Sequence, residues 1–133
     1  MANIETICAL ATAVGQGGIG VVRISGPLAS DIANQVLRRN LEPRYAYYGS
    51  FYDGEGDEID KGVAIYFPNP HSYTGEDVFE LQGHGGMSVM RQLLEVATSL
   101  GARLAEPGEF SKRAFLNGKM DLEIGRASCR ERV

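Results

Sequence analysis

The chain has 133 residues, of which 44% are hydrophobic and 23% are charged, and its formal net charge is −4 at pH 7. This length and composition are typical of one soluble globular domain with its own core. No apolar run approaches the ~20 residues of a membrane span, and Met1–Glu5 lacks the basic start of a secretory signal, so we expect a cytoplasmic protein. Cys8 and Cys129 are the only cysteines and show no metal-type spacing with His71 or His84. A disulfide framework and a zinc site therefore have no support.

The last ten residues, 124–133, show no apolar periodicity and look like vector read-through. Without their three arginines and Glu131, the formal charge of the chain changes from −4 to −6. A domain with this net negative charge is poorly suited to be the main nucleic-acid-binding surface, because affinity for nucleic acid comes largely from neutralising phosphates. We therefore do not expect this chain to bind RNA directly. We expect one domain over residues 1–122 and a vector-derived tail over 123–133.

The first third of the chain predicts two strands and a helix. Residues 5–12 alternate in polarity as a strand does, and 19–25 predict a second strand, with the glycine-rich segment 15–18 as the turn between them. The apolar spacing in residues 27–39 predicts an amphipathic helix, with Pro27 acceptable in its first turn.

The middle of the chain predicts a hairpin, a loop and a further strand. Residues 45–52 and 62–67 are rich in aromatic and β-branched residues, and the acidic segment 53–56 lies between them, which predicts a hairpin with a solvated tip. Two prolines and a glycine in residues 68–75 exclude regular structure there. This loop leads into a predicted strand over residues 78–82.

The last predicted elements are two helices and a short strand. Residues 88–100 have helical apolar spacing, and Gly101 suits the end of that helix. Residues 102–105 can form a short strand, and 111–116 predict a last helix followed by an exposed loop over 117–121. Strands interleaved with three helices indicate an α+β fold with a mixed sheet.

A carboxylate lies inside the apolar strand predicted for residues 78–82. In an extended segment, Phe79 and Leu81 face one side of the sheet, and Val78, Glu80 and Gln82 face the other. Glu80 then lies on a half-buried face. Burying an unpaired carboxylate costs several kcal/mol, so the Glu80 side chain needs a cation, a donor-rich ligand or water.

Three charged residues lie where the pattern would accept a neutral one: Arg23 and Glu80 within strands, and Lys119 in a glycine-containing turn. Arg23 and Glu80 can pair across the sheet, a contact worth ~0.2–1 kcal/mol if exposed, or they can bind a ligand. The pattern leaves both interpretations open for Arg23 and Glu80. For Lys119 it favours plain solvent exposure.

His84 lies within the glycine-rich segment 83–86 and could act as a general base or bind a ligand, since imidazole ionises near neutral pH. No serine or cysteine nucleophile with a recognisable elbow accompanies it, so we interpret it as a structural turn residue. The glycine runs 15–18 and 83–86 could expose backbone N–H groups to an anion. Neither run matches GxxxxGK[ST] or GxGxxG, and we expect no nucleotide site.

Three long segments, taken together, resemble a known family: Ala13–Gly26, Ser72–Gly86 and Pro107–Leu122. They resemble the N-terminal domain of the bacterial tRNA-modification GTPases of the MnmE (TrmE/ThdF) family. The resemblance runs from about Glu5 through Leu122. From Glu123 onward the sequence departs from the family pattern, which indicates a fragment of a longer GTPase.

The resemblance implies a tetrahydrofolate-binding and dimerisation domain, similar in fold to the folate-binding domains of glycine-cleavage aminomethyltransferases. The positions that match the family's folate contacts are Arg23, Glu80 and Lys119. The implied ligand is 5-formyl- or 5,10-methylene-tetrahydrofolate. A pterin amino group and its neighbouring ring N–H suit a carboxylate such as Glu80, whereas Arg23 and Lys119 suit the ring carbonyl and the anionic end.

The resemblance also implies what the whole protein does. A member of this family hydrolyses GTP with Mg²⁺ and K⁺ and works as a homodimer. With a flavin-dependent partner subunit, it modifies C5 of the wobble uridine of certain tRNAs, using a one-carbon unit from folate. Because this chain has no phosphate-binding loop, we expect it to be non-catalytic by itself.

A second interpretation is a self-association module without folate binding of its own. The loop aromatics Tyr73 and Phe110 could serve an interface as easily as a pocket. A weaker third interpretation is a small enzyme that uses His84 as its base.

Overall fold

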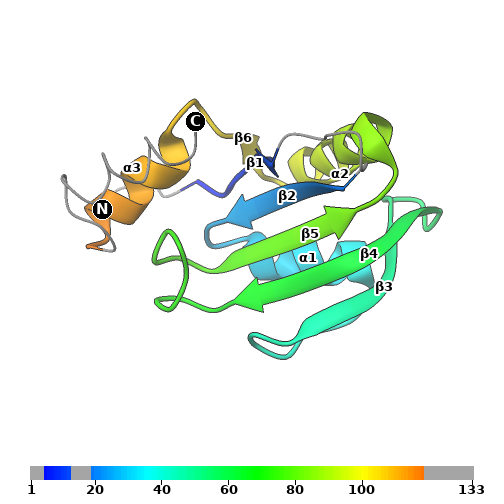
Figure 1. Cartoon of the computed structure of the whole chain (residues 1–133), viewed down its shortest axis with the longest axis horizontal. Coiled ribbons are helices and arrows are strands. Elements are labelled where there is room, and N and C mark those ends of the chain that lie inside the picture. Colours follow the sequence, from blue (N-terminus) through cyan, green and yellow to red (C-terminus); the bar gives the residue numbers. More distant parts are fainter. Residues whose placement is uncertain (1–4, 13–18, 119–133) are drawn as a thin grey trace.

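In the computed structural model, which describes residues 5–12 and 19–118, six strands form one sheet and three helices accompany it (Figure 1). The elements, in chain order, are β1 (Ile7–Thr12), β2 (Gly20–Ser25), α1 (Ala29–Leu37), β3 (Ala46–Tyr52), β4 (Glu58–Phe67), β5 (Val78–Gly83), α2 (Gly86–Ser99), β6 (Arg103–Leu104) and α3 (Glu109–Leu116). The sheet has the order β3-β4-β5-β2-β1-β6. All neighbouring strands are antiparallel except β1 and β6, which are parallel. The predicted α+β fold with a mixed sheet is confirmed.

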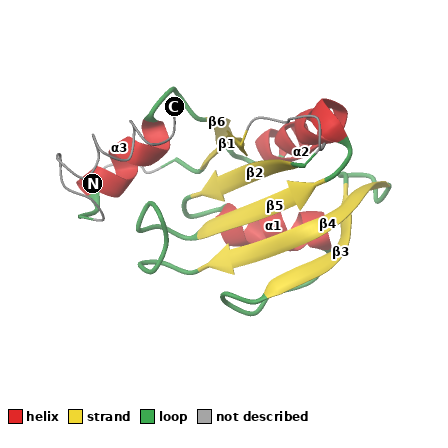
Figure 2. Cartoon of the chain, in the orientation of Figure 1, coloured by secondary structure: helices red, strands yellow, loops and turns green. Residues whose placement is uncertain are grey.

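Helices α1 and α2 cover one face of the sheet, and Figure 2 shows the opposite face of β3, β4, β5 and β2 without a helix over it. The apolar spacing that predicted α1 places Ile32, Ala33, Val36 and Leu37 on its buried side. These side chains meet the inward-facing side chains of the strands. The strand and α2 residues of this core are Cys8, Val22, Ile24, Phe51, Ala64, Phe79, Leu81, Val89, Met90, Leu93 and Ala97.

The alternation predicted for β5 is confirmed by burial from Phe79 to Gln82, whereas Val78, predicted on the half-buried face, is 1% exposed. Phe79 and Leu81 are buried in the core, whereas Glu80 and Gln82 are only half-buried and belong to the other face. The antiparallel register of β2 and β5 places Arg23 directly opposite Glu80. Two of the three charged positions that stood out in the sequence are therefore neighbours on the uncovered face.

Several elements begin at a different residue from the one predicted. β4 begins at Glu58 rather than at residue 62, because its pairing with β3 continues to the hairpin tip, where Tyr52 lies opposite Glu58. Helix α3 begins at Glu109 rather than at residue 111. Helix α1 begins at Ala29, so Pro27 precedes the helix instead of lying in its first turn.

Helix α2 begins at Gly86, two residues before the predicted start, and a side chain from β4 explains how. The Asp60 carboxylate accepts hydrogen bonds from the backbone N–H groups of His84 at 2.8 Å and Gly85 at 3.2 Å. These N–H groups belong to the N-cap residue Gly85 and to the residue before it. Asp60 thus fixes the turn that leads into α2, a helix whose N-cap has no side-chain hydrogen bond.

We expect Asp60→Ala to lower the free energy of unfolding by about 0.5–1.5 kcal/mol, because two N–H groups in the turn before α2 lose their acceptor. Urea denaturation followed by circular dichroism measures this difference. Asp57→Ala is the matched control, because Asp57 is an exposed carboxylate of the same hairpin. Equal stability losses in the two variants would contradict a stabilising role of Asp60 in the turn before α2.

The predicted glycine-rich turn over residues 15–18 and the site residue Lys119 lie outside the described residues. Within residues 5–12 and 19–118, no helix has the length and apolar character needed to cross a bilayer.

Candidate functional site

Arg23 and Glu80 form an ion pair on the uncovered face of the sheet. Both Nε and Nη2 of Arg23 donate to the same carboxylate oxygen, Oε2 of Glu80, at 3.1 and 3.0 Å. The side chains are 22% and 20% exposed, so solvent screens the pair only partly. The pairing that the sequence left open is therefore present. Among the described residues, Glu80 Oε1 and Arg23 Nη1 make no hydrogen bond, so each partner keeps one polar atom for another contact.

An open cleft of about 350 Å³ lies beside this ion pair. Its walls come from β1 and β2, from the loop before β5, and from α3 with the segment that leads into it. The lining residues are Ala9, Leu10, Ala11, Arg23, Tyr73, Ala105, Glu106, Pro107, Gly108, Phe110 and Ser111. Arg23 lines the cleft directly, whereas Glu80 is not among the lining residues and is connected to the cleft through Arg23.

Two aromatic rings flank the Arg23 guanidinium. Its Cζ lies 5.1 Å from the ring centroid of Tyr73 and 5.7 Å from that of Phe110. Both distances are within the range of cation–π attraction. The Tyr73 hydroxyl and the Ser111 Oγ are 2.9 Å apart and share a hydrogen bond, which joins the loop before β5 to α3. The cleft thus combines a cation with flat apolar surfaces.

A network of ion pairs lies next to the cleft, and the sequence analysis missed it. Arg113 Nη1 donates to both carboxylate oxygens of Glu76, at 3.0 and 3.3 Å, and Arg103 binds both oxygens of Glu109, at 3.1 and 2.7 Å. The hydrogen bond from Arg103 is the main cause that lowers the pKa of Glu109 to about 2. The one local sign of this network is the spacing of Glu109 and Arg113, which are four residues apart on one helix.

The two histidines are exposed and do not line this cleft. The backbone N–H of His84 is held by Asp60, and its ring Nδ1 lies 3.5 Å from the carbonyl oxygen of Lys61. Cys8 is buried in the core, and burial raises the pKa of its thiol to about 11. None of these side chains is arranged as a nucleophile with a base.

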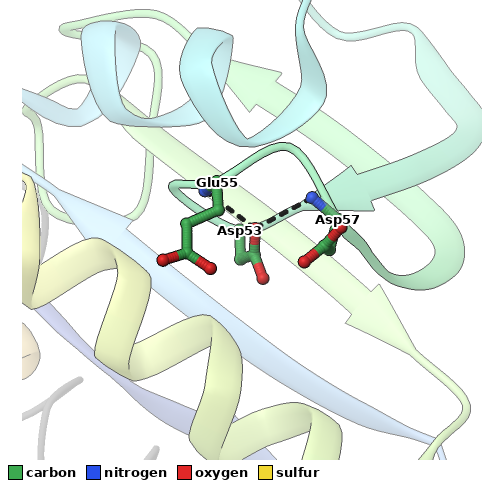
Figure 3. Close-up of side chains that lie close together, drawn as sticks. All are labelled: Asp53, Glu55 and Asp57. Atoms are coloured by element: carbon green, nitrogen blue, oxygen red, sulfur yellow. Dashed lines mark hydrogen bonds between the residues drawn. The ribbon is translucent and has the colours of Figure 1, made fainter.

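Three acidic side chains converge at the tip of the β3–β4 hairpin (Figure 3). Carboxylate oxygens of Asp53, Glu55 and Asp57 lie within 4.8 Å of one another. Asp53 Oδ1 accepts the backbone N–H groups of Glu55 and Asp57, both at 2.9 Å, so this carboxylate stabilises the turn. Glu55 and Asp57 are exposed to solvent.

The fold and the cleft define a small mixed-sheet α+β domain with a charged, aromatic-walled cleft between the sheet and its last helix. Comparison with known families shows which family this domain belongs to. The chain belongs to the family described as "GTP-binding protein TrmE N-terminus", whose model matches residues 6–119. The family resemblance found in the sequence is confirmed.

Relatives of the chain carry the name tRNA modification GTPase MnmE. The protein of Vesicomyosocius okutanii is 68% identical over 117 residues, which are 88% of this chain and 26% of the relative. The protein of Pseudomonas syringae is 59% identical over 118 residues, which are 89% of this chain and 26% of the relative. The chain thus spans about a quarter of the length of these curated relatives.

Proposed function

We propose that this chain is the folate-binding domain of a tRNA-modification GTPase and that the cleft beside Arg23 holds a reduced folate. The observation that carries the proposal is the position of Arg23, which lines the cleft between two aromatic rings while it pairs with Glu80. The ligand contacts come from Arg23, Glu80 and Lys119, of which Lys119 lies outside the described residues.

The chemistry of a reduced folate suits these side chains. The pterin ring presents an amino group and an adjacent ring N–H, and a carboxylate oxygen such as Glu80 Oε1 can accept a hydrogen bond from such donors. The aromatic rings of Tyr73 and Phe110 offer flat surfaces for ring stacking. Arg23 suits the pterin carbonyl or the anionic glutamate end. A volume of about 350 Å³ falls within the range of small-molecule sites.

The proposal extends to the parent protein. The ligand is 5-formyl- or 5,10-methylene-tetrahydrofolate, which supplies a one-carbon unit. GTP hydrolysis with Mg²⁺ and K⁺ belongs to the part of the relatives that this chain lacks. The whole protein works in the cytoplasm as a homodimer through this domain, and it modifies C5 of the wobble uridine of certain tRNAs with a flavin-dependent partner subunit.

We expect 5-formyl-tetrahydrofolate to bind the wild-type chain in isothermal titration calorimetry, and Glu80→Ala to weaken binding by about 10–100-fold. This loss corresponds to one charge-assisted hydrogen bond of about 1.5–3 kcal/mol. Gln82→Ala is the matched control, because Gln82 is half-buried on the same face of the same strand. Equal affinity in wild type and Glu80→Ala would remove the proposed role of Glu80.

A second candidate function is self-association without folate binding. It is favoured by the uncovered sheet face, where Tyr48 is 65% exposed and lies opposite Val63, which is half-buried. Aromatic and aliphatic side chains on an uncovered face are the composition of an interface core. A molecular mass that rises with concentration, together with no heat of folate binding, would favour this alternative.

A further inference from the structure

Helix α3 is attached to the domain mainly by polar contacts, unlike the two helices that cover the sheet. Ala114 is the buried residue of α3 among those described, whereas α1 and α2 bury most of their apolar side chains in the core. Phe115 and Leu116 on α3 are exposed. Figure 1 shows α3 at one end of the sheet, away from α1 and α2. The position of α3 therefore depends on its charged side chains, together with the hydrogen bonds of Ser111 to Tyr73 and of Asn117 to the Thr74 carbonyl oxygen.

Four charged residues, Arg103, Glu109, Arg113 and Glu76, form what we call the α3 network. Arg103 on β6 binds Glu109 with two hydrogen bonds, and Glu109 lies 3.5 Å from Arg113 one turn along the helix. Arg113 in turn binds Glu76, which precedes β5. The network thus connects α3 on one side to the sheet edge and on the other to the loop before β5.

Glu76 connects this network to a buried pair of hydroxyl side chains. Its Oε1 accepts a hydrogen bond from the hydroxyl of Ser25 at 2.7 Å, and Ser25 shares a further hydrogen bond of 2.7 Å with Thr74. Ser25 and Thr74 are fully buried, and the side chains of Glu76 and Arg113 are each 12% exposed. In such a site, removing one partner leaves the other charge without compensation, which is far more disruptive than breaking a surface ion pair.

Both walls of the cleft are held by the same network. Phe110 and Ser111 line the cleft from α3, directly after Glu109 and in the turn before Arg113. Tyr73 lines it from the other side, three residues before Glu76. The Glu76–Arg113 ion pair therefore holds together the two segments that carry the aromatic walls, in addition to the Tyr73–Ser111 hydrogen bond between the walls themselves.

We propose that Arg113 is a positioning residue for the cleft: by binding Glu76, it sets the separation of Tyr73 and Phe110 at which a flat folate ring fits beside Arg23. This inference rests on the proposed function. Arg113 does not touch the ligand and acts through the position of α3. Its Nη1 donates to both oxygens of Glu76 while its Nη2 donates to Glu109 Oε2 at 3.5 Å, so one planar guanidinium bridges two carboxylates in a fixed geometry that a lysine does not reproduce.

The test combines hydrogen–deuterium exchange with calorimetric titration of 5-formyl-tetrahydrofolate on the full 133-residue chain. We expect Arg113→Met to speed amide exchange in α3 but not in α2, and to weaken folate binding by about tenfold or more. Arg113→Lys, which keeps the charge, is expected to bind with intermediate affinity. Lys112→Met is the matched control, because Lys112 is an exposed cation on the same helix and should leave both measurements unchanged.

The possible outcomes separate the two proposals. Faster exchange in α3 with wild-type folate affinity would overturn the positioning role and leave the folate site standing. If amide exchange in α3 is unchanged in Arg113→Met, the α3 network does not fix the position of α3, and the proposed role of Arg113 is overturned. If the wild-type chain binds no folate, both proposals fail. If Arg113→Met also speeds amide exchange in α2, the substitution has destabilised the whole domain. Exchange in α3 and folate affinity are then compared between the wild type and Arg113→Lys, which keeps the charge.

Discussion

Replacing Phe79 with alanine is expected to lower the free energy of unfolding by about 3–5 kcal/mol. Phe79 lies on β5, faces the helices and is 1% exposed. Its ring is stacked on that of Tyr66, with centroids 4.5 Å apart and an interplanar angle of 8°. The substitution removes the buried ring and leaves a cavity that rigid strands on both sides of β5 cannot close. Urea denaturation followed by circular dichroism measures the change.

Tyr48→Ala is the matched control for this experiment. Tyr48 is an aromatic residue of the same sheet, but it is 65% exposed on the uncovered face, so its loss should change stability by about 0.5 kcal/mol or less. A loss below about 1 kcal/mol for Phe79→Ala would mean that the helix-covered face is not the stabilising core. A large loss for Tyr48→Ala would instead indicate that the uncovered face is buried in solution, as in a dimer.

The elements of the fold could be predicted because their signals are local and periodic. The apolar spacing of Ile32, Val36 and their neighbours defines α1, and the alternation around Glu80 defines β5. Element starts were predicted less well, because they depend on contacts distant in sequence. Asp60 satisfies N–H groups at the start of α2 from 24 and 25 residues away, and no pattern within residues 83–88 reveals this.

The candidate site was predicted in part. Arg23 and Glu80 stood out because each interrupts an apolar strand, but their direct opposition follows from the register of β2 against β5. That register depends on the global pairing of the sheet, so the sequence left pairing and ligand binding as alternatives. The two are compatible in this geometry, since Glu80 keeps one carboxylate oxygen that Arg23 does not use.

The α3 network could not be predicted, because its central contact joins a loop to a helix. Glu76 and Arg113 are 37 residues apart, and neither interrupts an apolar pattern. A charged residue in a loop or on a helix surface is usually exposed to solvent, so nothing in the sequence indicated that these two side chains would be largely shielded from it. Burial of these two side chains follows from the way α3 folds back onto the end of the sheet.

Exchanging the charges of Arg23 and Glu80 is expected to separate the structural role of this ion pair from its role in ligand binding. Arg23→Glu alone places two carboxylates directly opposite each other, and Glu80→Arg alone places two cations there. We expect each single variant to lose about 1.5–3 kcal/mol of stability, because both hydrogen bonds of the charged pair are lost. The double variant restores an opposite-charge pair and should recover most of this loss in urea denaturation.

Folate binding should not recover in the double variant, because the cation and the carboxylate then present the wrong polarity to the cleft and to the pterin donors. The calorimetric affinity of Arg23→Glu/Glu80→Arg should remain at least about 10–100-fold below that of the wild type even though the chain is folded. Recovery of both stability and affinity would mean that the pair only stabilises the sheet. If the double variant recovers neither stability nor affinity, the sheet accepts the ion pair only with the arginine on β2 and the glutamate on β5. Far-UV circular dichroism distinguishes this result from loss of the fold.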